Sequence, residues 1–85
     1  MESNPAREFL TDNYCEDPQA SGVETKIIYK WYAEFCEESG YHKLGEAMFG
    51  KEVRRVFRNV ERCRVGTKGN RFHVYRGLHE GEKDL

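Results

Sequence analysis

The sequence lacks the features of several common classes of small protein. No run approaches the ~18 consecutive apolar residues that a membrane-spanning helix needs. The N-terminal stretch MESNPAREF has neither the basic start nor the apolar core of a signal peptide. The three cysteines are odd in number and far apart, which excludes a disulfide framework. We therefore expect a soluble intracellular domain that makes no contact with a membrane.

Sites for catalysis, metals and cofactors are also missing from the sequence. There is no C-x-x-C motif, and the histidine nearest to any cysteine, His42, follows Cys36 by six residues, which is too wide for a credible zinc site. No nucleophile is paired with a base, and no carboxylate pair has a plausible pocket. We predict that the chain is not an enzyme and binds no metal or cofactor. We also predict that Cys15, Cys36 and Cys63 are buried free thiols.

The length and composition are those of one small folded domain. The chain has 85 residues, of which 38% are hydrophobic and 34% charged, and its apolar content exceeds that of a disordered segment. A chain this short buries only roughly 60–65% of its unfolded surface, so it cannot form a deep cleft between two lobes. We expect a single domain over residues 1–85, with an ordered core over about 5–78 and a flexible tail over 79–85.

The net charge of −1 conceals two oppositely charged halves. Residues 1–42 contain three Lys or Arg against nine acids, and residues 43–85 contain eleven against six. The net charges of the halves are therefore −6 and +5. This division predicts a polarised surface whose basic side faces an anionic partner.

The acidic half begins with a predicted helix and a short strand. Asn4-Pro5 is typical of a helix start, and apolar spacing continues that helix to about Cys15. Residues 16–22 contain Pro and Gly and predict a loop. Val23-Glu24 predicts a short strand before the next helix.

A second predicted helix has two apolar stripes. Thr25 is its predicted N-cap, and Gly40 its predicted C-cap. Apolar residues recur at four-residue steps in two adjoining series, which predicts that both series face one core. These series are Ile27, Trp31 and Phe35, and Ile28, Tyr32 and Cys36.

A third predicted helix, from near Gly45 to about Phe57, has a cluster of cations. Its apolar face includes Phe49 and Val53, and four cations recur at three- and four-residue steps on the opposite face. Like charges at such spacings destabilise a helix by roughly 0.2–0.5 kcal/mol per pair. Because the sequence accepts this cost, we interpret the cluster as a binding surface. Its members are Lys51, Arg54, Arg55 and Arg58.

After the third helix the apolar period changes from 3.6 to 2, which is typical of strands. Residues 60–65 and 71–76 predict two strands, and the glycine-rich residues 66–70 between them predict a hairpin turn. The whole order predicts an α+β winged-helix fold, in which three helices are followed by a two-stranded β-hairpin wing.

A winged helix whose third helix and wing are both basic fits duplex DNA. The two elements reach neighbouring grooves, and each phosphate that they neutralise adds about −0.9 to the log–log dependence of affinity on salt. We predict that the chain binds double-stranded DNA. The candidate DNA-binding residues are Lys51, Arg54, Arg55, Arg58, Arg62, Arg64, Lys68, Asn70, Arg71 and Arg76.

Motifs in both halves resemble the RFX family of winged-helix DNA-binding domains. Residues 49–57 read FGKEVRRVF and residues 64–70 read RVGTKGN, and the likeness extends over roughly residues 8–78. The sequence departs from the family pattern at the start of the wing. Where family members usually have two adjacent arginines, this chain has Cys63-Arg64.

The resemblance implies a sequence-specific transcription regulator in the nucleus that binds imperfect palindromes called X-boxes, on which a second copy can bind. It also implies that the wing makes most major-groove contacts while the third helix overlies the minor groove. On that analogy, Arg62, Arg64, Lys68 and Arg71 work in or beside the major groove. Lys51, Arg54, Arg55 and Arg58 hold the backbone or enter the minor groove.

Two alternatives remain open. Residues 29–38 and 49–51 are also similar to the C-terminal winged helix of phage and poxvirus primase-helicases, which implies an accessory domain that holds DNA without base specificity during viral replication. In the second alternative, the acidic face of the first two helices binds a basic protein partner. Its acids are Glu16, Asp17, Glu34, Glu37 and Glu38.

Overall fold

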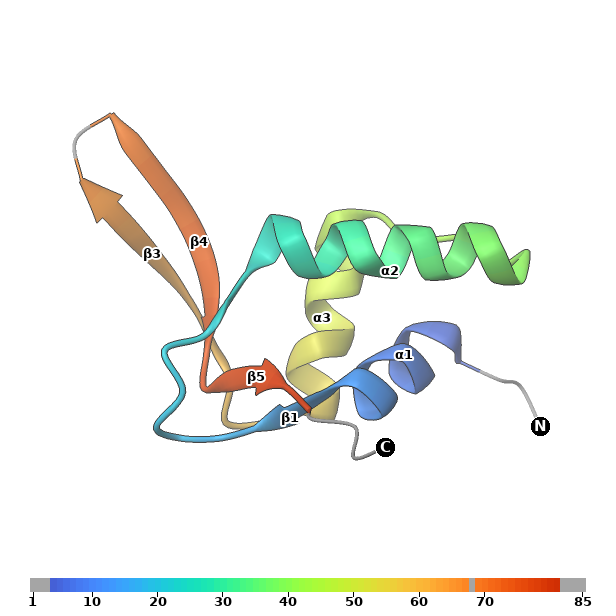
Figure 1. The fold of residues 1–85 in the computed structure, drawn as a ribbon, viewed down its shortest axis with the longest axis horizontal. Helices are drawn as coiled ribbons and strands as arrows, with labels where there is room; N and C mark the ends of the chain where they lie inside the picture. The colour runs from blue at the N-terminus through green and yellow to red at the C-terminus, as the bar shows by residue number, and fades with distance from the viewer. Residues whose placement is uncertain (1–3, 68, 82–85) are drawn as a thin grey trace.

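The computed structural model describes residues 4–67 and 69–81, and it confirms the predicted winged-helix fold. Three helices form a cluster from which one β-hairpin projects (Figure 1), which gives the molecule dimensions of 43 × 28 × 24 Å. The elements are α1 (Pro5–Asn13), β1 (Tyr14–Glu16), β2 (Val23–Glu24), α2 (Thr25–Ser39), α3 (Glu46–Val56), β3 (Glu61–Thr67), β4 (Asn70–Arg76) and β5 (Leu78–Glu80).

The core lies where the three helices meet. α1 contributes Phe9 and Leu10, and α2 contributes Tyr32, which stacks on Phe49 of α3 with ring centroids 4.4 Å apart. Leu78, from the C-terminal end of the described chain, is fully buried in the same core. Burying side chains of this size contributes about 1.5–3 kcal/mol each.

Only one of the two predicted apolar stripes of α2 is buried. Ile28, Tyr32 and Cys36 face the core, as predicted. The prediction that the adjoining stripe also faces the core is wrong, because Ile27 is 46% exposed and Trp31 50% exposed. Phe35 is partly buried and packs at the edge of the core. α1 and α3 cover one side of α2, and no further element of the described chain covers the second stripe.

The start of α1 is confirmed, whereas its predicted end is wrong. The side-chain oxygen of Asn4 accepts a hydrogen bond from the backbone N–H of Arg7 at 3.2 Å, and Pro5 is the first helical residue. The helix ends at Asn13 rather than near Cys15. The chain becomes extended at this point because Tyr14–Glu16 pairs with another strand as β1.

The predicted N-cap of α2 is also wrong, by one residue. Thr25 is the first helical residue, and Glu24 takes the cap position without a side-chain hydrogen bond. The backbone is extended through Glu24 because Val23 and Glu24 pair with β4. Gly40 is confirmed as the C-cap, with a left-handed φ of 74°. In the described parts of the chain, no helix is both long and apolar enough to cross a bilayer.

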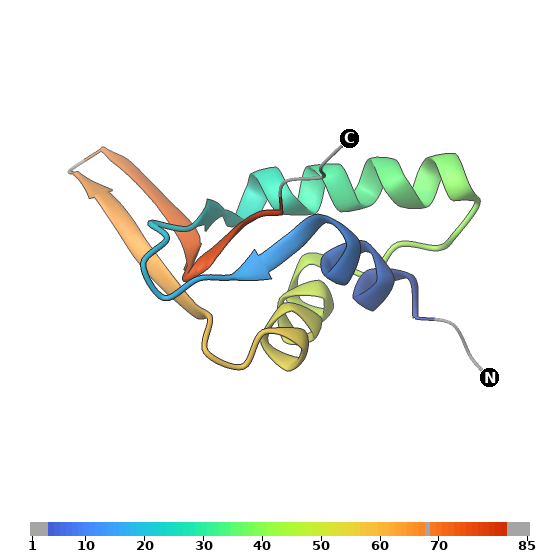
Figure 2. The same ribbon diagram turned by 60° about the horizontal axis from the view of Figure 1, so that its bottom comes forward.

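The predicted flexible tail is ordered at its start. Leu78–Glu80 forms β5, which pairs antiparallel with β1, so that Cys15 lies opposite His79. Figure 2 shows β5 (red) beside β1 (blue). The backbone N–H of Gly81 also donates to the carbonyl of Asn13 at 2.9 Å. The prediction missed this pairing because its partners come from the two ends of the chain. Residues 82–85 lie outside the described part.

The cysteines are all free, but only one of them is buried. Cys36 lies in the core, whereas Cys15 and Cys63 are partly exposed, so the prediction of three buried thiols is wrong for two of them. Both partly exposed cysteines lie on strands, where one face of the sheet is accessible. The pairing of β1 with β5 also brings the thiol of Cys15 to 3.0 Å from Nε2 of His79.

Two core tyrosines resist ionisation. Burial raises the pKa of Tyr14 to about 12, and the nearby Glu80 carboxylate adds to the effect. Burial likewise raises the pKa of Tyr32 to about 12. The folded protein therefore holds these protons more tightly than the unfolded chain, in which a tyrosine titrates near pH 10. The two protonated tyrosines stabilise the folded state fully below pH 10, and this stabilisation is lost as the pH rises toward 12.

We predict that Tyr14→Phe makes stability less sensitive to alkaline pH, because it removes one of the buried tyrosines whose pKa the fold raises. The measurement is the urea midpoint of both proteins from neutral pH to about pH 11. The decline above about pH 10 is expected to be shallower in the variant. Parallel curves for the two proteins would contradict this assignment.

The neighbouring isoleucines of α2 offer a matched test of its orientation. Ile28 is fully buried and Ile27 is 46% exposed. Ile28→Ala is expected to lower the free energy of unfolding by about 2–4 kcal/mol, and Ile27→Ala by less than about 1 kcal/mol. Urea unfolding followed by far-UV circular dichroism measures both. Equal losses would show that α2 is rotated from the orientation described.

Candidate nucleic-acid interface

The cations of the third helix are exposed, as predicted, but only three of the four lie on the helix itself. α3 buries Phe49 and Val53, which turns Lys51, Arg54 and Arg55 toward solvent. The helix ends at Val56, so Arg58 belongs to the turn that follows. The cluster therefore consists of a helical part and a turn residue.

Arg55 differs from the other helical cations because it has an ionic partner. Its Nη1 lies 3.4 Å from Oε1 of Glu52, one turn away on the same helix. Glu52 is largely buried and also accepts a hydrogen bond from the side-chain amide of Asn4, at 3.4 Å. These contacts connect α3 to the start of α1. They direct part of the charge of Arg55 toward the protein rather than toward a ligand.

Lys51 and Arg54 lie where α3 meets the wing. Together with Arg62 of β3 they line a hollow of about 410 Å³. Among the residues that the structure describes, one acid, Glu46, lines the same hollow. The topology thus brings together cations that the sequence places on two separate elements.

The floor of this hollow includes the buried ring of Tyr75 from β4. Burial raises the pKa of Tyr75, and the positive charges of Arg62 and Arg54, which line the same hollow, partly oppose this effect. A Cβ atom on Gly50 would lie 3.1 Å from the Tyr75 hydroxyl. The small residue at position 50 therefore permits the close approach of α3 and β4 at this point.

The wing has one basic face. The antiparallel register pairs Arg62 with Tyr75, Arg64 with His73, and Gly66 with Arg71. Directly paired residues of an antiparallel ladder project on the same side, and residues two apart along a strand share a face. Arg62, Arg64, Arg71 and His73 therefore form one face, here called the basic wing face. It continues into the hollow through Arg62.

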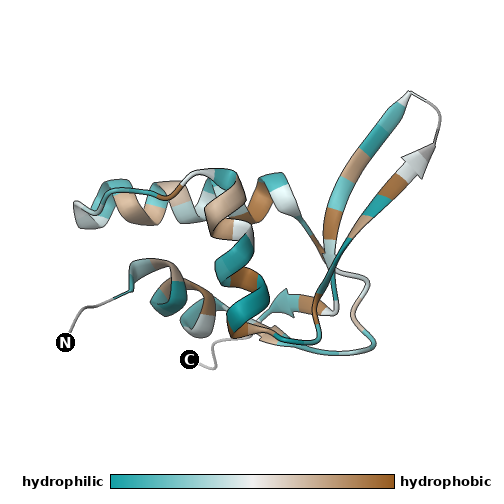
Figure 3. Ribbon diagram, turned by 180° about the vertical axis from the view of Figure 1, so that it is seen from behind, coloured by the Kyte–Doolittle hydropathy of each residue, from teal (hydrophilic) through white to brown (hydrophobic). Residues whose placement is uncertain are grey.

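The opposite wing face has a different character. It includes the apolar side chains of Val65, Phe72 and Val74. Arg76 is on this side, where it pairs with Glu61 and lines a smaller hollow with Glu16. Figure 3 shows the resulting alternation of hydrophilic and hydrophobic residues along the wing, with the hydrophilic band of α3 turned toward the viewer.

The candidate residues thus divide into groups. Five of them surround the hollow or lie on the basic wing face, and these five are here called the basic surface: Lys51, Arg54, Arg62, Arg64 and Arg71. Arg55 and Arg58 flank it, and Arg76 and Asn70 fall on the opposite wing face. Lys68 lies outside the described residues.

Sequence reasoning missed two features of this surface. It did not identify Tyr75 as the residue that joins the wing to α3. It also grouped Arg76 with the other wing arginines, although the alternation of strand residues separates position 76 from positions 71, 73 and 75. The odd or even position of each residue along the strand already separates Arg76 from the others in the sequence. The register adds which residues of β3 and β4 are paired.

The wing turn is tighter than predicted. β3 extends to Thr67 and β4 begins at Asn70, so two residues connect the strands in place of the predicted turn over residues 66–70. Gly66 lies inside β3 with a φ of +116°, and a Cβ there would lie only 2.0 Å from the Asn70 carbonyl oxygen. The wing therefore requires glycine at this position.

The comparisons with known proteins all point to one family. Residues 3–82 match the family model described as the RFX DNA-binding domain. The chain is 34% identical over 68 residues to DNA-binding protein RFX7 of Xenopus laevis, a match that covers 80% of this chain and 5% of that protein. It is 34% identical over 77 residues to DNA-binding protein RFX2 of Rattus norvegicus, covering 89% and 11%. Against MHC class II regulatory factor RFX1 of Homo sapiens it is 34% identical over 71 residues, covering 84% and 7%.

We predict that Gly66→Ala disrupts the wing while leaving the helices folded. The new methyl group must displace the Asn70 carbonyl, and the left-handed backbone adds a cost of about 1–3 kcal/mol. Gly69→Ala is the matched control, because Gly69 also has a positive φ of 93° but a Cβ added there would meet nothing within 4 Å. Cross-strand NOEs between β3 and β4 are expected to disappear in the first variant only. Loss in both variants would contradict the special role of Gly66.

Proposed function

Since the chain belongs to the RFX family of DNA-binding domains, we propose that it binds double-stranded DNA as the DNA-binding domain of a sequence-specific transcription regulator. The observation that best supports this proposal is the basic surface. Five cations from α3, β3 and β4 are gathered around one hollow and one wing face, with Glu46 as the acid that lines the hollow with them. The role is one of binding rather than catalysis.

The basic surface supplies two kinds of contact. Lys and Arg neutralise phosphates and release counterions, so affinity falls with salt at a log–log slope of about −0.9 per phosphate contacted. Arginine also forms bidentate hydrogen bonds with the O6 and N7 atoms of guanine in the major groove. Arg62, Arg64 and Arg71 present this side chain on one side of a β-ribbon. Phosphate contacts position the domain, and these arginines supply the base contacts.

The shape of the wing supports a docking mode with the wing in the major groove. That groove is about 12 Å wide and admits a two-stranded β-ribbon. Arg62 and Arg64 are two residues apart on one strand and therefore about 7 Å apart along the wing. With the wing seated, Lys51 and Arg54 of α3 contact the adjacent backbone and minor groove.

We also propose in what kind of protein, and where in the cell, this domain works. The matched segments span only 5–11% of the lengths of the relatives named above, so the activity of a whole protein is inferred by analogy. By that analogy the domain works in the nucleus, and two copies occupy the two half-sites of an X-box palindrome. The stoichiometry on DNA, measured by sedimentation, tests the second copy.

Fluorescence anisotropy on three labelled probes tests the function. The probes are an X-box palindrome, a scrambled duplex of equal length and the single strand, each titrated at several salt concentrations. We expect the palindrome to bind at least about tenfold more tightly than the scrambled duplex, with a steep salt dependence. Equal affinity for the two duplexes would favour the non-specific accessory domain of a primase-helicase. Absence of binding at low salt would overturn the proposal.

A matched pair of arginines tests which wing face contacts DNA. Arg62→Ala is expected to weaken duplex binding by about tenfold and to reduce the salt slope by about 0.9 if the contact is to a phosphate. Arg76→Ala removes the same charge from the opposite wing face, beside Glu61, and is expected to change affinity by less than about twofold. Circular dichroism checks that both variants fold. Equal losses would contradict the assignment of one basic wing face.

A further inference from the structure

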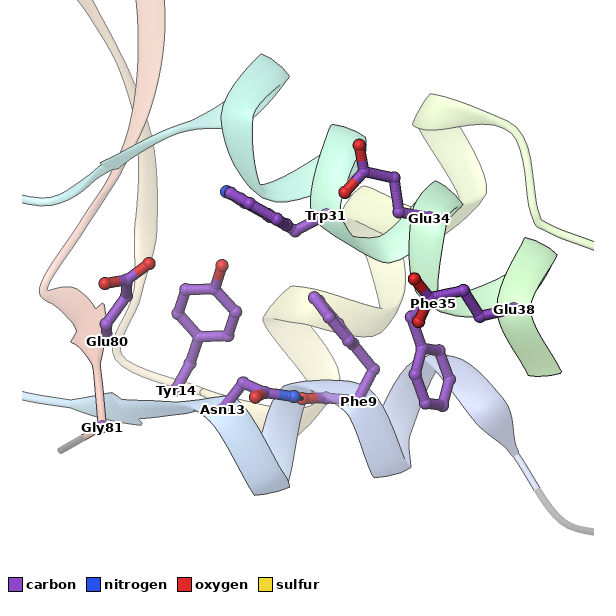
Figure 4. A pocket seen from close by; sticks show the side chains of 9 residues that line it. All are labelled: Phe9, Asn13, Tyr14, Trp31, Glu34, Phe35, Glu38, Glu80 and Gly81. Carbon is purple, nitrogen blue, oxygen red and sulfur yellow. Dashed lines mark hydrogen bonds between the residues drawn. The ribbon is translucent and has the colours of Figure 1, made fainter. Parts of the chain in front are cut away.

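A second surface, distant from the wing, has the character of a binding groove. It lies between α1 and α2, next to the β1–β5 pair, and has a volume of about 500 Å³. Figure 4 shows its side chains, with those of α2 above and those of α1 below. None of the candidate DNA-binding residues that the structure describes lines it. The proposed DNA-binding function leaves this groove unexplained.

The floor of the groove is aromatic and held in place by the core. The ring of Phe9 lies 5.8 Å from that of Tyr14 and 5.4 Å from that of Phe35, centroid to centroid. Above them Trp31 is 50% exposed, although aromatic side chains of this size are mostly buried. Ile27, one turn earlier on the same stripe of α2, is 46% exposed. The groove therefore offers a preformed apolar surface.

The groove is bordered by carboxylates. Glu34 and Glu38 extend from α2, and Glu80 extends from β5 on the other side. No Lys, Arg or His is among the described residues that line it. The described side chains that line it carry a formal charge of −3, which complements a cationic ligand and repels a nucleic acid.

The acids at the end of α2 have no evident structural benefit. Carboxylates near a helix C-terminus oppose the helix dipole, at a cost of about 0.3–1 kcal/mol each. Glu37 and Glu38 are in the last turn of α2, which contains no basic residue to offset them. A ligand cation would relieve this repulsion.

The groove and the hollow beside the wing share none of the described residues that line them. α3 lies behind α1 and α2 in the view of Figure 1, which is the direction from which Figure 4 shows the groove. In the reverse view of Figure 3, α3 is in front. A ligand in the groove would therefore not cover Lys51 or Arg54 on α3.

We propose that this groove binds a basic peptide segment of a partner protein, with an apolar side chain on the aromatic floor and arginine or lysine side chains against Glu34, Glu38 and Glu80. The indole of Trp31 adds a favourable surface for a cation. Charge complementarity selects this occupant over an acidic or purely apolar segment. Of the five acids in the predicted acidic face, Glu34 and Glu38 line the groove, whereas Glu16, Asp17 and Glu37 do not.

Trp31 is the single tryptophan of the sequence, so its fluorescence reports directly on the groove. The probes are three synthetic peptides of equal length: one of alternating arginine and leucine, one with glutamate in place of arginine, and one with serine in place of leucine. The arginine–leucine peptide is expected to change the Trp31 emission saturably and to bind at least about tenfold more tightly than the other two.

Two glutamates of α2 provide the matched control. Glu38→Gln removes a carboxylate from the groove, whereas Glu37→Gln removes its neighbour, which lines a different hollow. Glu38→Gln is expected to weaken peptide binding by about threefold or more, and Glu37→Gln to leave it nearly unchanged. Duplex binding by both variants should equal that of the wild type, so failure of this proposal is distinguishable from failure of DNA binding.

Three results would overturn the proposal. The first is the absence of any peptide-dependent change in Trp31 emission at low salt. The second is an equal effect of Glu37→Gln and Glu38→Gln, which would indicate non-specific attraction to an acidic face. The third is a concentration-dependent dimerisation that alters Trp31 emission. If Trp31→Ala abolishes that dimerisation, the occupant of the groove is a second copy of the chain.

Discussion

The aromatic contact between α2 and α3 determines how the rest of the domain is arranged. Tyr32 stacks on Phe49, and its hydroxyl oxygen accepts a hydrogen bond from the backbone N–H of Leu44 at 3.0 Å. Tyr29 donates to the carbonyl of the same residue at 2.7 Å. These contacts hold the loop before α3 against α2 and fix the rotation of α3 about its axis. Because Phe49 must face Tyr32, the side of α3 that bears Lys51 turns outward.

This arrangement gives the domain two oppositely charged sides. The basic side is formed by α3 and one wing face, and the acidic side by α2 and β5. A polyanion approaching the domain is attracted to the first and repelled by the second, so the charge distribution orients the domain before any specific contact forms. The near-neutral net charge of −1 is therefore compatible with DNA binding, because the spatial separation of charge produces the attraction.

The helices, the wing and the basic residues could be predicted from local patterns, because helix and strand periods and glycine turns depend on neighbouring residues. Features that depend on contacts between distant parts of the chain could not be predicted in this way. The pairing of β1 with β5 joins residues 14–16 to residues 78–80, and no local signal specifies it. The exposure of Trp31 depends on how few elements surround α2, which is a property of the whole cluster. The hollow around Tyr75 likewise required the meeting of α3 with β4.

The two-faced wing also bears on the departure from the family pattern at Cys63. Family members usually have arginine at both positions that enter the wing, and this chain has Cys63-Arg64. The register places Cys63 opposite Val74, on the face that also includes Phe72, whereas Arg64 is on the basic wing face. An arginine at position 63 would therefore not lie beside Arg62 and Arg64, and its absence removes no charge from the basic wing face. The departure changes the apolar side of the wing and leaves the side proposed to contact bases intact.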